Sequence, residues 1–71
     1  MRHPALGVFG KQVRKIRLSR KISQEKLAEM AEVHRNFIGV VERGESNCGL
    51  LMVIAIAKAL HVRPAKLVAT L

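Results

Sequence analysis

The chain has one cysteine, two phenylalanines, and neither tryptophan nor tyrosine among its 71 residues. A single cysteine excludes an intrachain disulfide and fits a reducing compartment, so packing must hold the fold together. So few aromatic rings argue against a platform on which the bases of single-stranded nucleic acid stack. No apolar run is long enough for a signal peptide or a membrane span. We therefore expect a cytoplasmic protein with no membrane partner.

Acidic residues are also scarce, because five Asp and Glu stand against 13 Lys and Arg, for a net charge of +8. The basic residues that precede the first acidic one, Glu25, are Arg2, Lys11, Arg14, Lys15, Arg17, Arg20 and Lys21. A basic domain of this kind usually meets a polyanion. Charge alone leaves a second interpretation open, a solvated surface that only keeps the protein soluble.

Groups that could support catalysis or metal binding are dispersed along the chain. His3, His34 and His61 have no ligand spacing with one another or with Cys48. No motif places a base beside Cys48, and no glycine-rich loop could cradle a phosphate. We therefore expect no enzyme activity, no metal, no cofactor and no small-molecule ligand.

Residues 23–44 have the pattern of a short helix, a tight turn and a second short helix. Ser23 is a good N-cap, and Gly44 stands where a left-handed C-cap residue is usual. Apolar residues recur at helical spacing in both halves: Leu27, Ala28 and Ala31, then Phe37, Ile38 and Val41. Helices this short cannot bury their apolar faces alone, so the rest of the chain must complete the core.

This stretch carries a family resemblance. Its motifs are Ser23-Gln24-x-x-Leu27-Ala28, Val33-His34-Arg35-x-Phe37-Ile38 and Glu42-Arg43-Gly44-x-x-Asn47. They resemble the Cro/phage-repressor (XRE) family of helix-turn-helix DNA-binding proteins, over residues 9–68. The run of residues 34–39 also resembles the small controller proteins of restriction-modification systems. The resemblance implies an all-α fold, a compact five-helix lambda-repressor-like DNA-binding domain.

In that architecture helices 2 and 3 form the helix-turn-helix motif, residues 23–43. Residues 1–8 are an N-terminal arm or the start of helix 1. We expect helices over residues 6–20, 23–30, 35–43, 50–61 and 64–69. The resemblance also pairs Arg17 with Glu42, a structural ion pair that joins helix 1 to helix 3.

The outward face of the second helix carries the side chains expected to meet DNA. Arg and Asn pair in bidentate fashion with guanine and adenine edges in the major groove, so Arg35 and Asn36 are the best candidates. The base-reading set is Arg35, Asn36, His34, Gly39 and Val40. The set expected to contact phosphates, which the resemblance implies, is Ser23, Gln24, Arg43, Ser46 and Asn47.

Two positions depart from the family pattern where glycine is common. Lys21 stands at the C-cap of helix 1, and Glu32 stands in the turn. A residue other than glycine at the C-cap of helix 1 is expected to carry backbone strain of about 1 kcal/mol.

The segment from residue 50 to 61 is apolar nearly all round. The face expected to point inward is Leu50, Val53, Ile56, Ala57 and Leu60. The remaining apolar residues of this segment, together with apolar residues at the end of the chain, predict a dimer interface. They are Leu51, Met52, Ile54, Ala55, Leu67, Val68 and Leu71. A two-fold dimer would set two recognition helices about one DNA turn apart, ~34 Å, facing a palindrome.

These observations favour a homodimeric regulator of transcription that binds a palindromic operator in double-stranded DNA, in the prokaryotic cytosol or nucleoid. The controller proteins are the narrower group it resembles. The alternative is a protein-interaction module, similar to an antitoxin, that binds a partner through the apolar surface of helices 4 and 5.

Overall fold

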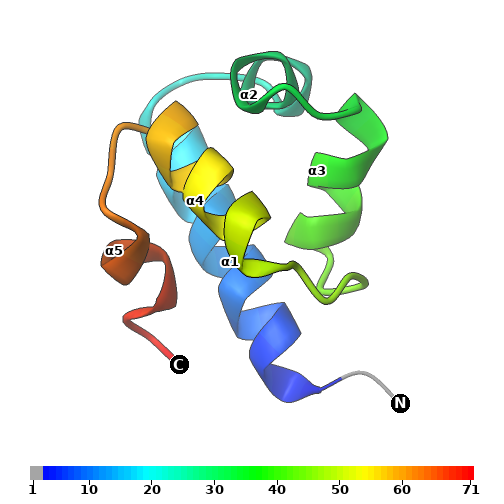
Figure 1. Cartoon of the computed structure of the whole chain (residues 1–71), viewed down its shortest axis with the longest axis vertical. Helices are drawn as coiled ribbons and strands as arrows, with labels where there is room; N and C mark the ends of the chain where they lie inside the picture. Colours follow the sequence, from blue (N-terminus) through cyan, green and yellow to red (C-terminus); the bar gives the residue numbers. More distant parts are fainter. Residues whose placement is uncertain (1–2) are drawn as a thin grey trace.

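Five helices follow one another in residues 3–71, the part of the chain that the computed structural model describes (Figure 1). They are α1 (Pro4–Ser19), α2 (Gln24–Ala31), α3 (Arg35–Glu42), α4 (Leu50–Ala59) and α5 (Pro64–Val68). The predicted all-α, five-helix fold is therefore correct. Of the predicted arm, residues 4–8 belong to α1, and residues 1 and 2 lie outside the described residues.

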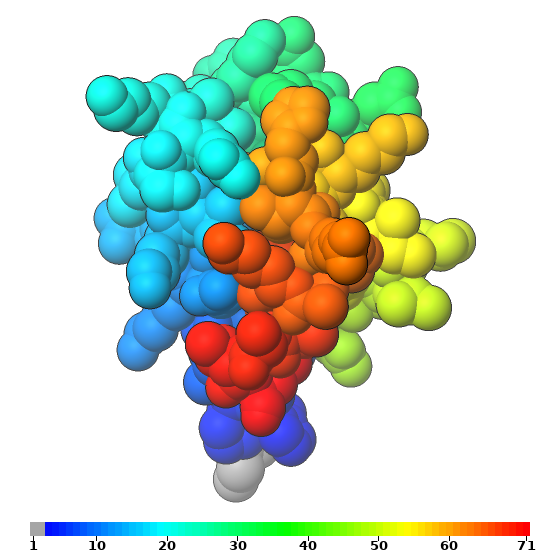
Figure 2. All heavy atoms as spheres, turned by 90° about the vertical axis from the view of Figure 1, so that its left-hand side faces the viewer, coloured from blue at the N-terminus to red at the C-terminus, as the bar shows by residue number. Residues whose placement is uncertain are grey.

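α1 contacts the helix-turn-helix through α3 and the C-terminal part of the chain through α5. α3 packs against both α2 and α1, while α4 packs against α2 and α5. Figure 2 shows α5 and the residues after it, in orange and red, lying between the blue of α1 and the yellow of α4. The Gln12 side-chain amide donates a hydrogen bond of 3.1 Å to the carbonyl oxygen of Lys66 and ties α5 to α1. Within residues 3–71, no helix combines the length and apolarity needed to cross a membrane.

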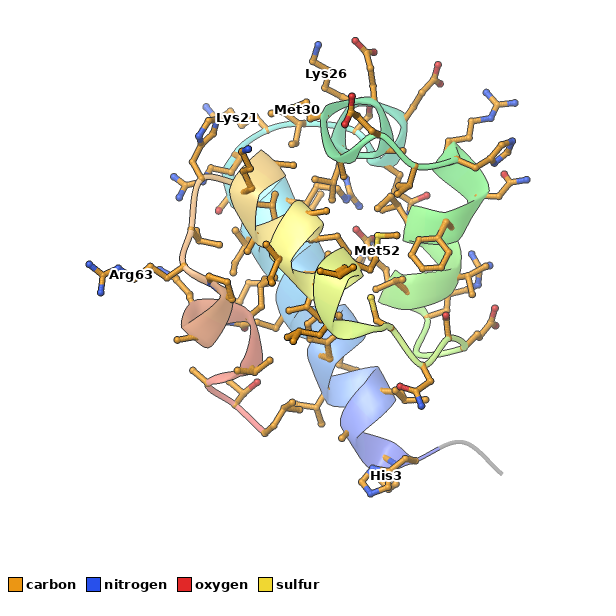
Figure 3. The ribbon with its side chains drawn as sticks, viewed as in Figure 1. His3, Lys21, Lys26, Met30, Met52 and Arg63 are labelled. Atoms are coloured by element: carbon orange, nitrogen blue, oxygen red, sulfur yellow. The ribbon has the colours of Figure 1, made fainter. Side chains whose placement is uncertain are left out.

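Side-chain caps begin three of the helices, as their sequences favour. The Ser23 hydroxyl oxygen accepts a hydrogen bond of 2.9 Å from the backbone amide of Lys26, as predicted for an N-cap. The ring Nδ1 of His34 accepts one of 3.1 Å from the amide of Asn36. His3 caps α1 in the same way (Figure 3). These bonds satisfy amides that the helix itself leaves without a partner.

Within residues 3–71, three residues other than glycine adopt the left-handed backbone conformation where helices end. They are Lys21, Glu32 and His61, with φ near 59°, 59° and 58°. The strain expected at Lys21 therefore has a backbone basis, because a side chain in this conformation costs roughly 1–2 kcal/mol, and Glu32 and His61 share this cost. Gly44, at φ 73°, takes the conformation predicted for it without that cost.

Replacing Lys21 with glycine is expected to raise the free energy of unfolding by about 0.5–1 kcal/mol. The strain is relieved, and part of the gain is lost because glycine makes the unfolded chain more flexible. Urea unfolding measures the change. Lys15→Gly is the matched control, since it removes another exposed lysine, from within α1, and should cost about 1 kcal/mol. Equal losses in both variants would contradict the assignment of strain to Lys21.

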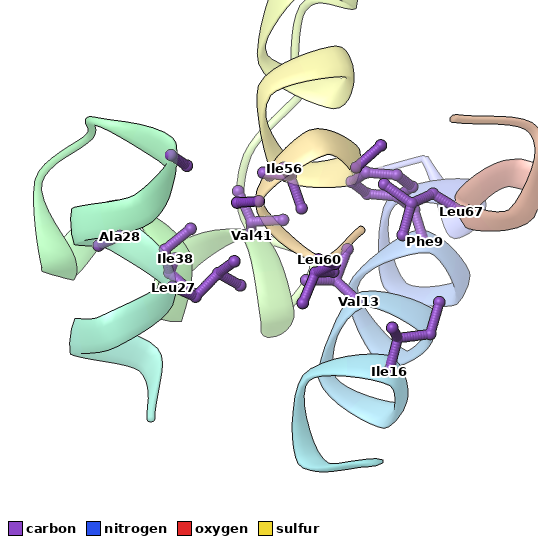
Figure 4. Packing of buried hydrophobic residues seen from close by; sticks show 13 residues of the cluster. Phe9, Val13, Ile16, Leu27, Ala28, Ile38, Val41, Ile56, Leu60 and Leu67 are labelled. Atoms are coloured by element: carbon purple, nitrogen blue, oxygen red, sulfur yellow. The ribbon is translucent and has the colours of Figure 1, made fainter. Parts of the chain in front are cut away.

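The core is a single cluster to which every helix contributes (Figure 4). Its largest fully buried side chains are Leu27, Ile38, Ile56, Leu60, Leu67, Val13 and Val41. Ile38 and Val41 are buried as predicted, whereas Phe37 is only partly buried against the cluster. At roughly 1.5–3 kcal/mol for each fully buried large side chain, this cluster is the main source of stability.

Two assignments of apolar residues from the sequence are wrong. Leu67, expected at the dimer interface, is completely buried between α5 and the core. Leu50, expected to point inward, is 73% exposed. α4 is apolar on nearly every face, so its sequence pattern could not show which face the other helices would cover.

Candidate nucleic-acid interface

The outer face of α3 and the start of α2 enclose a shallow groove. Its lining residues are Gln24, Glu25, Arg35, Asn36, Gly39, Val40 and Arg43. Four of the five predicted base-reading positions lie there, together with two of the predicted phosphate contacts. A groove lined by arginine and amide side chains along one helix suits the edges of base pairs, which present hydrogen-bond donors and acceptors.

Arg35 and Asn36 stand exposed in the first turn of α3. The Arg35 guanidinium lies 3.6 Å from the Glu25 carboxylate, and both side chains are largely open to solvent. A pair this exposed contributes little to stability, so Arg35 can exchange Glu25 for another acceptor at small cost. His34 lies just outside the groove, with its Nδ1 occupied by the cap, and Val40 is half-buried inside it.

Gly39, a member of the predicted base-reading set, lines the groove but is covered by side chains. It is buried, because two side chains lie over it. A Cβ atom at Gly39 would stand 3.0 Å from Nη1 of Arg43 and 3.5 Å from Oε1 of Gln24. The glycine therefore makes room for two neighbouring polar groups.

A buried ion pair joins α1 to α3 behind the groove. Arg17 donates from Nε to Oε2 of Glu42 over 2.6 Å and from Nη2 to Oε1 over 3.0 Å. A third bond runs from Nη1 to the carbonyl oxygen of Ile22, over 2.9 Å. The pair implied by the resemblance is thus present, and it ties α1 to the end of α3 in a bidentate geometry with the guanidinium satisfied on three nitrogens.

Gln24 joins this ion pair to the groove, a contact that sequence reasoning missed. Its amide nitrogen donates to Oε1 of Glu42 over 3.0 Å. Its amide oxygen points to the space above Gly39. The predicted phosphate contact by Gln24 therefore starts from a side chain that is already held by Glu42. The two residues are 18 positions apart, so the sequence alone gives no indication that their side chains meet.

The other predicted phosphate contacts are dispersed around the groove. Ser23 is exposed at the start of α2, where its hydroxyl oxygen serves the cap. Ser46 and Asn47 lie in the loop after α3, half-buried and exposed respectively, and they do not line the groove. Arg43 does line it, and its Nε donates to Oε1 of Glu45 over 3.1 Å.

Two carboxylates beside the groove were not singled out from the sequence. Glu25 faces Arg35, and Glu45 faces Arg43, so each groove arginine has an acidic neighbour. Cys48, in the loop before α4, is partly buried, and this burial raises the pKa of its thiol. A protonated thiol is a poor nucleophile, and no motif in the sequence places a base beside Cys48.

The helix-turn-helix family HTH_3 matches residues 13–67 of this chain, which include α2, α3 and the groove. The chain belongs to this family of DNA-binding regulators. The helix-turn-helix resemblance predicted from residues 23–47 is therefore confirmed.

Two relatives of this chain are named as control proteins. The control protein C.BamHI of Bacillus amyloliquefaciens is 48% identical over 58 residues, which cover 80% of this chain and 72% of the relative. The control protein C.SmaI of Serratia marcescens is 43% identical over 60 residues, covering 84% and 71%. The resemblance of residues 34–39 to controller proteins is thus confirmed over most of the chain. Nothing in these relatives favours the antitoxin-like alternative.

Solved structures agree with this placement in the helix-turn-helix family. The restriction-modification controller protein C.AhdI from Aeromonas hydrophila is 35% identical, with a TM-score of 0.90 over 92% of this chain and 98% of that one. The controller protein C.Esp1396I, solved as a tetramer in complex with its natural 35 base-pair operator, is 26% identical. Its TM-score is 0.87 over 96% of this chain and 90% of that one.

Proposed function

We propose that this chain is a controller-type transcriptional regulator that binds a palindromic operator in double-stranded DNA as a homodimer, in the bacterial cytosol or nucleoid. We also propose that it has no catalytic activity. The observation that carries this function is the α3 groove, where Arg35, Asn36 and Arg43 present hydrogen-bonding groups along one helix. The relatives named as controller proteins support it, as does the operator complex of C.Esp1396I.

Specificity would come from the first turn of α3. The fork of Arg35 matches the O6 and N7 acceptors of guanine, and the amide of Asn36 matches the N6 and N7 atoms of adenine. Val40, half-buried in the same groove, can contact a thymine methyl group. Base contacts of this kind set the sequence that is bound.

Affinity would come mainly from phosphate contacts at the rim of the groove. The candidates are Ser23 with the amides at the start of α2, and Ser46 and Asn47 in the loop after α3. The net charge of +8 adds a long-range attraction to the DNA backbone. Binding should therefore weaken steeply as salt rises, because each neutralised phosphate releases counterions.

An apolar patch on α4 and the end of the chain would form the dimer interface. Leu51 is 82% exposed, and Ile54, Val68 and Leu71 are also open to solvent. Met52 and Ala55 are partly buried against the core and would join the patch only at its edge (Figure 3 labels Met52). Exposed apolar patches in a domain this small usually mark an interface.

Selection of bound duplexes from a random pool, followed by footprinting, tests the function. The proposal expects a palindrome whose half-sites are centred about 10 base pairs apart and protected by two chains. Salt-sensitive binding with no preferred sequence would contradict it.

The Leu51→Glu variant is expected to run as one chain in size-exclusion with light scattering, where the wild type runs as two. A buried carboxylate at a dimer interface without a partner opposes association. Leu18→Glu is the matched control, because Leu18 is an exposed leucine on α1 outside the patch. A dimer in both variants would place the interface elsewhere.

The Arg35→Ala variant is expected to lose about 1–3 kcal/mol of discrimination at one base pair of each half-site. Fluorescence anisotropy on the selected operator and on operators with single base-pair changes measures this loss. Arg63→Ala is the control, since it removes the same charge on the far side of the molecule from α3 (Figure 3). If Arg35→Ala weakens every duplex equally, Arg35 is a phosphate contact.

A further inference from the structure

The Arg43 side chain has an arrangement that a phosphate contact does not explain. Its guanidinium lies over Gly39 inside the α3 groove and is bonded to Glu45. We propose that Arg43 is a third base-reading residue and that Glu45 is the positioning residue that holds it in the groove. Gly39 provides the space it occupies. This inference rests on the proposed DNA-binding function and adds a specificity-determining group to it.

The backbone directs Arg43 into the groove from the end of α3. Arg43 is the C-cap residue of the helix, with φ −84° and ψ −1°, so its side chain leaves close to helical geometry. Long side chains in that geometry point back toward the start of the helix and cover the residue four positions earlier. That residue is Gly39, and Nη1 of Arg43 lies 3.0 Å from where its Cβ would be.

Because residue 39 is a glycine, the Arg43 guanidinium can lie directly over the α3 backbone. A methyl group there would be tighter against Nη1 than ordinary van der Waals contact, so the guanidinium would have to shift by a few tenths of an ångström. The opposite wall is Oε1 of Gln24, 3.5 Å from the same point. Gln24 is held in turn by its bond to the buried Glu42, so the far side of the space is fixed.

Glu45 holds the Arg43 guanidinium from the side opposite Gln24. Its backbone amide donates to the carbonyl oxygen of Val40 over 3.0 Å, which anchors the first residues of the loop against α3. Its carboxylate then accepts the Nε hydrogen of Arg43 over 3.1 Å. This bond uses one nitrogen and leaves Nη1 and Nη2 for a bidentate contact with guanine. The carboxylate also repels phosphate, which favours a base edge as the target.

Operators with single base-pair changes, built on the selected site, test this assignment. Arg43→Ala should lose about five- to hundredfold discrimination at one base pair in each half-site, different from that read by Arg35. Glu45→Ala should lose about two- to fivefold at that same base pair, the range of an exposed ion pair. Glu29→Ala is the matched control, because it also removes one exposed carboxylate, on α2 and outside the groove.

Gly39→Ala separates positioning from stability. Alanine is the better helix former, so the midpoint of thermal unfolding should rise. Discrimination at the Arg43 base pair should nevertheless fall, because the guanidinium is displaced. A loss of specificity in a more stable protein cannot come from unfolding.

Three results would overturn the inference. One is an Arg43→Ala variant that weakens all duplexes equally and lowers the salt slope by about 1, the behaviour of a phosphate contact. The second is a Glu45→Ala variant that behaves like Glu29→Ala. The third is unchanged discrimination in Gly39→Ala. A wild-type protein that prefers no sequence would instead refute the proposed function, so the two failures are distinguishable.

Discussion

Replacing Gly10 with alanine is expected to lower the free energy of unfolding by about 3 kcal/mol, among the larger effects of overpacking. A Cβ atom at this position in α1 would collide with the carbonyl oxygen of Val41 and stand 2.7 Å from that of Glu42. Both are backbone atoms of α3 and cannot rotate away. Relief of the clash requires α1 and the recognition helix to separate.

Gly7→Ala is the control for this effect. Gly7 lies one turn earlier in the same helix, and a Cβ built there meets nothing within 4 Å. Its replacement should stabilise the protein by up to about 1 kcal/mol, the ordinary preference of a helix for alanine. Urea unfolding of both variants measures the difference. Similar behaviour of the two would show that α1 and α3 can adjust their separation freely.

Removing the Glu42 carboxylate is expected to cost about 3–5 kcal/mol. The side chain of Glu42 is only 2% exposed and that of Arg17 only 8%, so Glu42→Ala leaves a buried guanidinium without its counter-charge. Gln24 also loses the acceptor that holds it at the groove. Operator binding should therefore weaken even at temperatures where the variant is still folded.

Two comparisons test the origin of that cost. Glu25→Ala breaks the exposed pair with Arg35 and should change stability by less than about 1 kcal/mol. The double variant Arg17→Met/Glu42→Leu removes both charges and should recover much of the loss, because well-packed apolar residues can replace a buried pair. Chemical unfolding of all three variants gives the values. A small loss in Glu42→Ala would show that water reaches Arg17.

The local features of the helix-turn-helix could be predicted because their causes lie within a few residues. Ser23 caps α2 through an amide three positions away, and Gly44 ends the turn after α3 by its own backbone freedom. The apolar spacing of Leu27 and Ile38 identifies the buried side of each helix. The predicted ends of every helix lie within two residues of the observed ends, because caps and helical periodicity define them.

Which residues of α4 and α5 are buried could be predicted less well. In α4 the hydrophobic pattern has no polar face to oppose it, so Leu50 was assigned inward although it is exposed. α5 has only five residues, too few for a helical period to show that Leu67 is buried. Which apolar residue is covered depends on helices far away in the sequence.

The sequence by itself determined the fold class, the family and the caps at Ser23 and Gly44, while the buried pair of Arg17 with Glu42 was implied only by the family resemblance. Only the tertiary structure decided what surrounds the groove: Gly10 against α3, Gln24 on Glu42, and Arg43 held over Gly39 by Glu45. The physical reason is that caps and helical faces depend on residues within one or two turns. The groove depends on how α1, α2 and α3 pack, and their packing brings together side chains that no spacing connects.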